Sequence, residues 1–87
     1  MINIEKLNEI EIAIIKAMHS RQIYGKNHKR IETITHSGFP SHLRKEVKKA
    51  ILLLIKKGLV VWYHKSDNSI QLNKEKLFEI SEIARNH

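Results

Sequence analysis

The chain has 87 residues, no cysteine and a formal net charge of +7. This length predicts a single domain spanning residues 1–87, and the lack of cysteine excludes disulfides, thiolate metal sites and thiol nucleophiles. The longest apolar run, residues 50–55, is far too short to span a bilayer. The first ten residues carry acidic side chains where a signal peptide would carry cations, so we expect a cytoplasmic protein.

The first helix is predicted over residues 3–21, and its apolar arc, which includes Ile12, is wider than one core contact needs. Its inward stripe is expected to consist of Leu7, Ile14 and Met18, flanked by Ile4, Ile10 and Ile15. A short strand at Ile23 and Tyr24 should follow. Residues 29–36 are expected to form a second helix.

A third helix is predicted over residues 40–57, after a tight connection in which Pro40 presets the first turn. Its apolar positions follow the helical period closely: Leu43, Val47, Ala50, Ile51, Leu54 and Ile55. Leu52 lies opposite this stripe. Gly58 is expected to end the helix.

The remaining residues predict a β-hairpin and a last helix. Residues 59–64 are rich in β-branched and aromatic side chains, and residues 69–73 alternate polar and apolar, so the two segments should pair across a turn at 65–68. Asn73 is placed to cap a final helix over residues 74–85. The expected fold class is therefore α+β and mostly helical.

Positive charge is concentrated in the middle of the chain. Residues 26–65 hold ten lysines and arginines against two glutamates, whereas residues 1–25 are neutral overall and residues 66–87 sum to −1. A chain that is basic only for solubility would spread its lysines. The concentration predicts a positive face and favours nucleic acid as the partner.

The order of elements resembles the winged helix-turn-helix family over most of the chain. The most telling string is EVKKAILLLIKKGLVVWYHKSDNSIQLN, residues 46–73, in which an amphipathic helix is followed by a strand, a turn and a return strand. Many small transcription regulators, especially archaeal ones, have this form. The string YGKNHKRIETITHSGFPSHLRKEVKKA, residues 24–50, is also similar to a set of small archaeal winged-helix proteins.

The wide apolar arc of the first helix, together with Phe78 away from the apolar stripe of the last helix, predicts a homodimer through helices 3–21 and 74–85. The resemblance implies that this protein is a nucleoid-associated regulator of transcription that binds double-stranded DNA. Helix 40–57 would enter the major groove, and the turn at 65–68 would meet the backbone or the minor groove. Arg44 is the best candidate for a bidentate contact with guanine. The expected DNA-binding residues are Lys26, Lys29, Arg30, Ser41, His42, Arg44, Lys45, Lys48, Lys49, Lys65, Ser66 and Asn68.

Other interpretations remain open from the residues alone. Lysines opposite an apolar stripe are also the ordinary solvated face of a helix. Winged helices serve as protein-binding modules in transcription or replication complexes, and structured RNA is a third possible partner. Phe39, Trp62 and Tyr63 could stack on unpaired bases, although the favoured expectation is that they fill the core.

Catalysis and metal binding find little support in the sequence. The histidines lack metal-ligand spacing, the chain has a single aspartate, and neither a nucleophile elbow nor a phosphate-binding loop is present. We therefore expect a protein that is not an enzyme, with no metal, no cofactor, no small-molecule ligand and no membrane contact.

Overall fold

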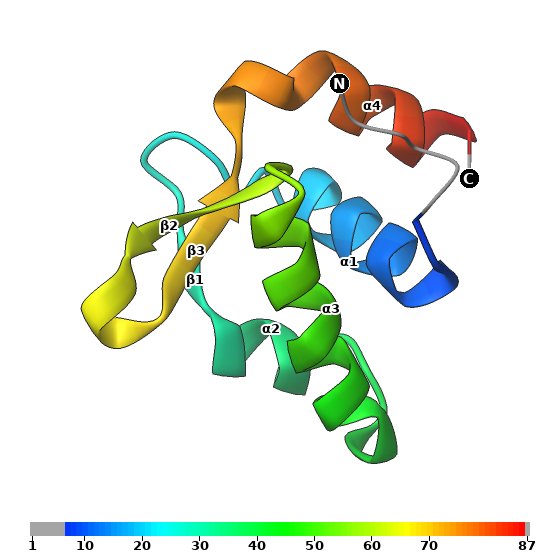
Figure 1. Cartoon of the computed structure of the whole chain (residues 1–87), viewed down its shortest axis with the longest axis vertical. Coiled ribbons are helices and arrows are strands. Elements are labelled where there is room, and N and C mark those ends of the chain that lie inside the picture. Colours follow the sequence, from blue (N-terminus) through cyan, green and yellow to red (C-terminus); the bar gives the residue numbers. More distant parts are fainter. Residues whose placement is uncertain (1–6, 87) are drawn as a thin grey trace.

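The computed structural model describes residues 7–86, which form four α-helices and a three-stranded antiparallel sheet (Figure 1). The helices are α1 (Glu9–Ser20), α2 (Ile31–Ser37), α3 (Arg44–Lys56) and α4 (Leu77–Asn86). The strands are β1 (Lys29–Arg30), β2 (Val60–His64) and β3 (Ser69–Leu72). The predicted α+β, mostly helical class is thus confirmed. None of the helices in this part of the chain is long and apolar enough to cross a membrane.

The hydrophobic core lies where α1 and α3 meet the inner face of the sheet. In Figure 1, α2 and α4 flank this pair, and the β2–β3 hairpin extends away from the helices. Leu54 of α3 is fully buried, whereas Leu52 is 45% exposed, so the predicted rotation of this helix is confirmed. The buried apolar residues are Leu7, Ile14, Ile15, Met18, Ile23, Ile31, Ile34, Val47, Ala50, Ile51, Leu54, Leu59, Val60, Ile70, Leu72, Ile80 and Ile83.

Helix α1 begins later than the sequence predicted. The Asn8 side chain accepts a hydrogen bond from the Glu11 backbone N–H at 2.8 Å, and Glu11 Oε1 accepts one from the Asn8 N–H at 3.0 Å. This reciprocal cap satisfies two donors at the helix start and fixes the boundary at Glu9. Leu7 precedes the helix, and residues 3–6 of the prediction lie outside the described part of the chain.

The same glutamate ties α1 to the end of α3. Glu11 is 1% exposed, and its Oε2 lies 2.6 Å from the ammonium nitrogen of Lys57. The lysine side chain is 31% exposed, so the pair lies at the edge of the core. A carboxylate removed from water in this way requires the partner, because an unpaired buried charge is strongly unfavourable.

The prediction of a short strand at Ile23 and Tyr24 is wrong. The Ile23 N–H donates to the Met18 carbonyl at 3.0 Å and closes the end of α1, while the Ile23 carbonyl accepts a single bond from Leu72 N–H at 2.7 Å. The third strand is instead β1, which occupies the residues predicted to begin the second helix, so α2 starts at residue 31. Pairing with β3 supplies β1 with hydrogen bonds that a helix would otherwise provide.

The predicted hairpin is confirmed, and the sheet has the order β1–β3–β2. A 3₁₀ turn over Lys65–Asp67 connects the two longer strands. Further 3₁₀ turns precede two helices: Ser41–Leu43 opens the segment that continues as α3, and Lys74–Lys76 leads into α4. Asn73 caps the latter turn, as predicted.

Candidate nucleic-acid interface

Every side chain that the sequence nominated for DNA contact is solvent-exposed. This holds for Lys26, Lys29, Arg30, Ser41, His42, Arg44, Lys45, Lys48, Lys49, Lys65, Ser66 and Asn68. Exposure permits contact with a partner but does not by itself create a site. What matters is which of these side chains the fold brings together.

Three of the cations converge at the junction of α2 and α3. Arg44, Lys45 and Lys48, from the first two turns of α3, line a shallow hollow of about 220 Å³ together with Glu32 and His36 of α2. Ile31 and Thr35 form the rest of its lining. Three permanent positive charges facing one carboxylate make this hollow favourable for phosphate oxygens, which Arg and Lys both bind.

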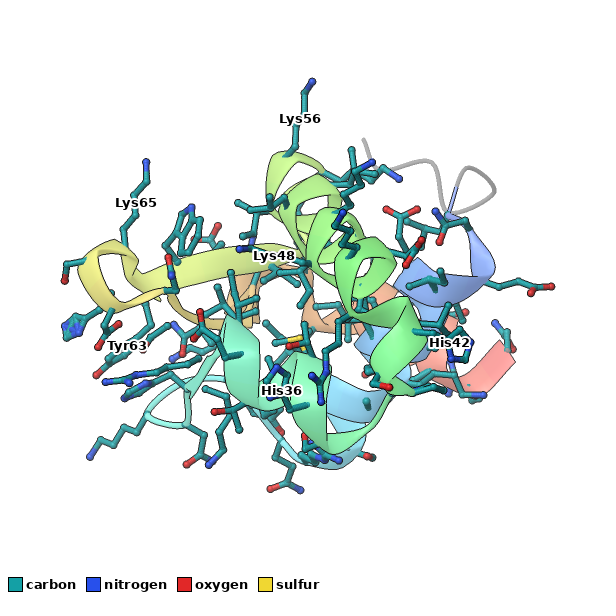
Figure 2. All side chains as sticks on the ribbon, turned by 90° about the horizontal axis from the view of Figure 1, so that it is seen from below. His36, His42, Lys48, Lys56, Tyr63 and Lys65 are labelled. Carbon is teal, nitrogen blue, oxygen red and sulfur yellow. The ribbon has the colours of Figure 1, made fainter. Side chains whose placement is uncertain are left out.

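The exposed face of α3 continues the positive charge along the helix. In residues 7–86 no ion pair links Arg44, Lys45, Lys48 or Lys49 to an acidic side chain. Helical spacing places Lys56 on the same face as Lys45, and in Figure 2 the side chain of Lys56 projects away from the body of the protein.

Lys49 lies on a different side of α3 from Lys48. It lines a separate hollow of about 220 Å³ with Ile10 near the start of α1 and with Leu53. The neighbouring Leu52 is about half exposed on the helix face that carries the lysines. The face is therefore basic at its N-terminal end and partly apolar toward its C-terminal end.

Ser41 and His42 lie in the 3₁₀ turn that precedes α3. Figure 2 shows His42 at the end of the molecule away from the hairpin, and His36 on the side between them. Ser41 and His42 therefore continue the exposed, lysine-bearing face of α3 beyond the start of the helix, in the direction away from the hairpin.

The hairpin turn presents Lys65 and Ser66 on a well-defined backbone. Asn68 has the left-handed conformation, with φ of 59°, and its carbonyl accepts a hydrogen bond from the Ile31 N–H at 3.0 Å. Asp67 Oδ1 accepts from the Ser69 N–H at 3.1 Å. Hydrogen bonding from Ser69 holds the pKa of the Asp67 carboxyl below its usual value, with smaller contributions from positive charge nearby. The turn thus has its own anchoring bonds.

Lys29, Arg30 and Lys26 are divided by the fold. The first two form β1, whose partners on β3 are Ile70 and Ser69. Lys26 lines a hollow that includes residues of both longer strands and the turn before α4, but none of α3. The structure consequently places Lys26 apart from the cations of α3.

Sequence reasoning missed a cluster of rings at the base of the hairpin turn. The imidazole of His28 stacks on the phenol ring of Tyr63 with a centroid distance of 3.9 Å and an interplanar angle of 8°. His64 meets the Tyr63 ring edge-on at 4.7 Å. Tyr63 is 40% exposed, so the expectation that it fills the core is wrong, whereas Phe39 and Trp62 pack against the core as expected.

No arrangement suited to a metal ion occurs in residues 7–86, because no three His, Asp or Glu side chains gather there in a way that could hold one. A scan against models of known protein families finds no match, and searches of curated proteins and of solved structures find no significant match either.

Proposed function

We propose that this chain is a winged helix-turn-helix protein that binds double-stranded DNA and regulates transcription. In this proposal α2 and α3 form the helix-turn-helix, and α3 enters the major groove. The β2–β3 hairpin is the wing, and its turn at residues 65–68 contacts the backbone or the minor groove. The element order and the three-stranded sheet in which β1 precedes α2 support this interpretation.

One observation carries the proposal: cations on α3 and on the hairpin turn face the same side of the molecule. Figure 2 shows Lys56 and Lys65 projecting to one side, with Lys48 lying between α3 and the hairpin. An ordinary solvated helix mixes charges of both signs, but the first two turns of α3 carry four cations and one glutamate, Glu46. Such a surface matches the phosphates of a duplex.

Salt dependence of binding tests the proposal. Affinity for a duplex should fall steeply as salt concentration rises, with a slope of roughly 0.9 logarithmic units per phosphate contact. The double variant Lys45→Ala/Lys48→Ala removes two cations from the α2–α3 hollow, so we expect weaker binding and a shallower slope. Since both side chains are exposed, the variant should unfold at nearly the same urea concentration as the parent.

A matched control separates local contact from overall charge. Lys74→Ala/Lys76→Ala removes the same amount of charge from the turn before α4, which lies outside α3 and the hairpin. We expect this control to bind duplex DNA nearly as the parent does. If both double variants lose affinity equally, the attraction is diffuse and α3 is not the DNA-contacting helix; if the parent itself does not bind at low salt, the proposal is wrong.

The proposal includes a homodimer formed through α1 and α4, which pack side by side. Phe78 on α4 is 74% exposed, the largest exposed fraction among the large apolar side chains described. On α1, Ala13 and Ile12, which also packs partly against the core, line a shallow hollow of about 290 Å³ together with Glu9 and Lys16. A two-fold interface over these helices would cover this apolar surface and leave α3 free.

A second candidate, a protein-binding module, is favoured by the apolar part of α3. Leu52 and Leu53 are 45% and 44% exposed, and neighbouring large apolar side chains at a helix surface are typical of protein contacts. Binding that does not respond to salt would favour this alternative over DNA binding.

A further inference from the structure

We propose that the ring cluster of His28, Tyr63 and His64 is a stacking site for an unpaired base of the nucleic acid that α3 binds. This inference rests on the proposed function, because it assigns a second contact to the same partner. The duplex contacts described above recognise a phosphate or the edge of a base. The ring cluster would instead recognise the face of a base.

The strand geometry turns Tyr63 out of the core. On β2, Trp62 pairs with Ile70 and His64 pairs with Ser69, so the register shifts between them and Tyr63 is an additional residue without a partner on β3. An extra residue of this kind re-aims its side chain and is frequent next to functional sites. Here it directs the phenol ring toward His28, which precedes β1.

One face of the Tyr63 ring is left uncovered by the two imidazoles. His28 covers the first face, with nearly parallel rings. The three centroid distances, 3.9, 4.7 and 6.3 Å, form an almost right-angled triangle with its corner at Tyr63, so His64 lies beside the ring edge. Tyr63 is 40% exposed, and neither imidazole lies over its second face, so the proposal places the incoming base on that face.

The charge around the cluster favours a nucleotide over other planar ligands. Lys29 and Arg30 follow His28 directly, whereas Asp67 is the acidic residue of the hairpin turn. A base that stacks on Tyr63 would bring its phosphates near these cations. Stacking platforms bordered by cations are how proteins bind single strands without reading their sequence.

The position of the ring indicates an unpaired base in particular. In Figure 2, Tyr63 and Lys65 lie on opposite sides of the hairpin ribbon, and Lys65 shares its side with Lys56 of α3. A duplex held on the α3 side keeps its base faces stacked inside the helix. Only a flexible single strand that leaves the duplex and passes around the hairpin can present a base face to Tyr63.

The experiment compares a blunt duplex with the same duplex carrying a short single-stranded tail, with 2-aminopurine in the tail as a fluorescent probe. The parent should bind the tailed duplex roughly 5-fold or more tightly than the blunt one, the gain that stacking of one base provides. Binding should also quench the probe, because the base stacks on an aromatic ring.

Three variants of Tyr63 test whether its ring is responsible. Tyr63→Ala and Tyr63→Leu should lose both the gain in affinity and the quenching while binding the blunt duplex as the parent does. Tyr63→Phe keeps the ring and should retain both. Tyr63→Leu preserves apolar bulk, so it serves if the alanine variant is less stable.

The result that overturns the inference is a gain and quenching that survive Tyr63→Leu, or the absence of any gain in the parent. In either case blunt-duplex binding by the parent, and its loss in Lys45→Ala/Lys48→Ala, would still support the proposed function. Failure of the parent to bind any duplex would instead refute the proposed function itself.

Discussion

The orientation of α3 decides which of its side chains face the solvent, and a pair of leucines tests this orientation. Leu54 is fully buried and Leu52 is 45% exposed, although both lie near the same end of one helix. Leu54→Ala removes three buried carbons, which costs about 2.4 kcal/mol at about 0.8 kcal/mol for each buried methylene. The cavity left behind adds to this, so we expect a loss of about 2–5 kcal/mol.

Leu52→Ala makes the same chemical change in the same helix, so differences in helix propensity cancel between the two variants. Because nearly half of the Leu52 side chain is already in water, its loss should be about 1 kcal/mol or less. Urea unfolding followed by far-ultraviolet circular dichroism measures both variants, and the fluorescence of Trp62, which packs against the core, provides a second probe. The slope of free energy against urea should not change.

Equal losses for the two variants would refute the reasoning. They would mean that α3 is rotated relative to the core, and the lysines assigned to its exposed face would then not lie together on the surface. A large loss for Leu54→Ala with a changed urea slope would instead indicate altered compactness of one state, and the comparison would have to be repeated with Leu54→Val.

Three further predictions concern the ion pair, the hairpin turn and the dimer. Lys57→Met should lower the free energy of unfolding by about 3–5 kcal/mol, because it leaves the buried Glu11 carboxylate without a partner. Glu11→Gln should lower it by less, and equal losses in urea unfolding would contradict this. The pKa of Asp67 in the folded protein lies below 3.8, the ordinary value for an aspartate. The ionised carboxylate therefore stabilises the turn above pH 3.8, and this stabilisation is lost as the pH falls through the lower pKa of the folded state. Hydrogen exchange of the Ser69 amide should therefore become less protected in acid, and Asp67→Ala should abolish that change; an unchanged pH response would refute it. Phe78→Ser should convert the expected dimer into a monomer in sedimentation at micromolar concentration, and a parent that is already monomeric would refute the dimer.

The amphipathic segments of this fold were predictable because their signal is local. The apolar spacing that buries Leu54 and exposes Leu52 lies within the single helix α3. The alternation of polar and apolar residues in 69–73 predicts the return strand of the hairpin. Asn73 is likewise a capping residue recognisable from its neighbours. Each of these features depends on side chains within a few positions of one another.

The features that escaped prediction depend on contacts between distant parts of the chain. β1 consists of two exposed cationic residues with no strand-like pattern, and only pairing with β3 makes it a strand. The stack of His28 on Tyr63 requires both β1 and the register shift on β2, and neither is visible in local sequence. The exposure of the cations was consequently predictable from the sequence, whereas the ring cluster was not.

The attachment of the hairpin to α2 sets the position of the hairpin turn relative to the helices. β1 joins β3 through the pairs Lys29–Ile70 and Arg30–Ser69, and the bond from the Ile31 N–H to the Asn68 carbonyl fastens the turn at the first residue of α2. The hairpin is thereby held to the start of α2 by backbone hydrogen bonds at both its strand and its turn. If α3 and the turn touch one duplex, the number of base pairs between their contacts is fixed by the protein, and any misfit in a target must be absorbed by bending of the DNA.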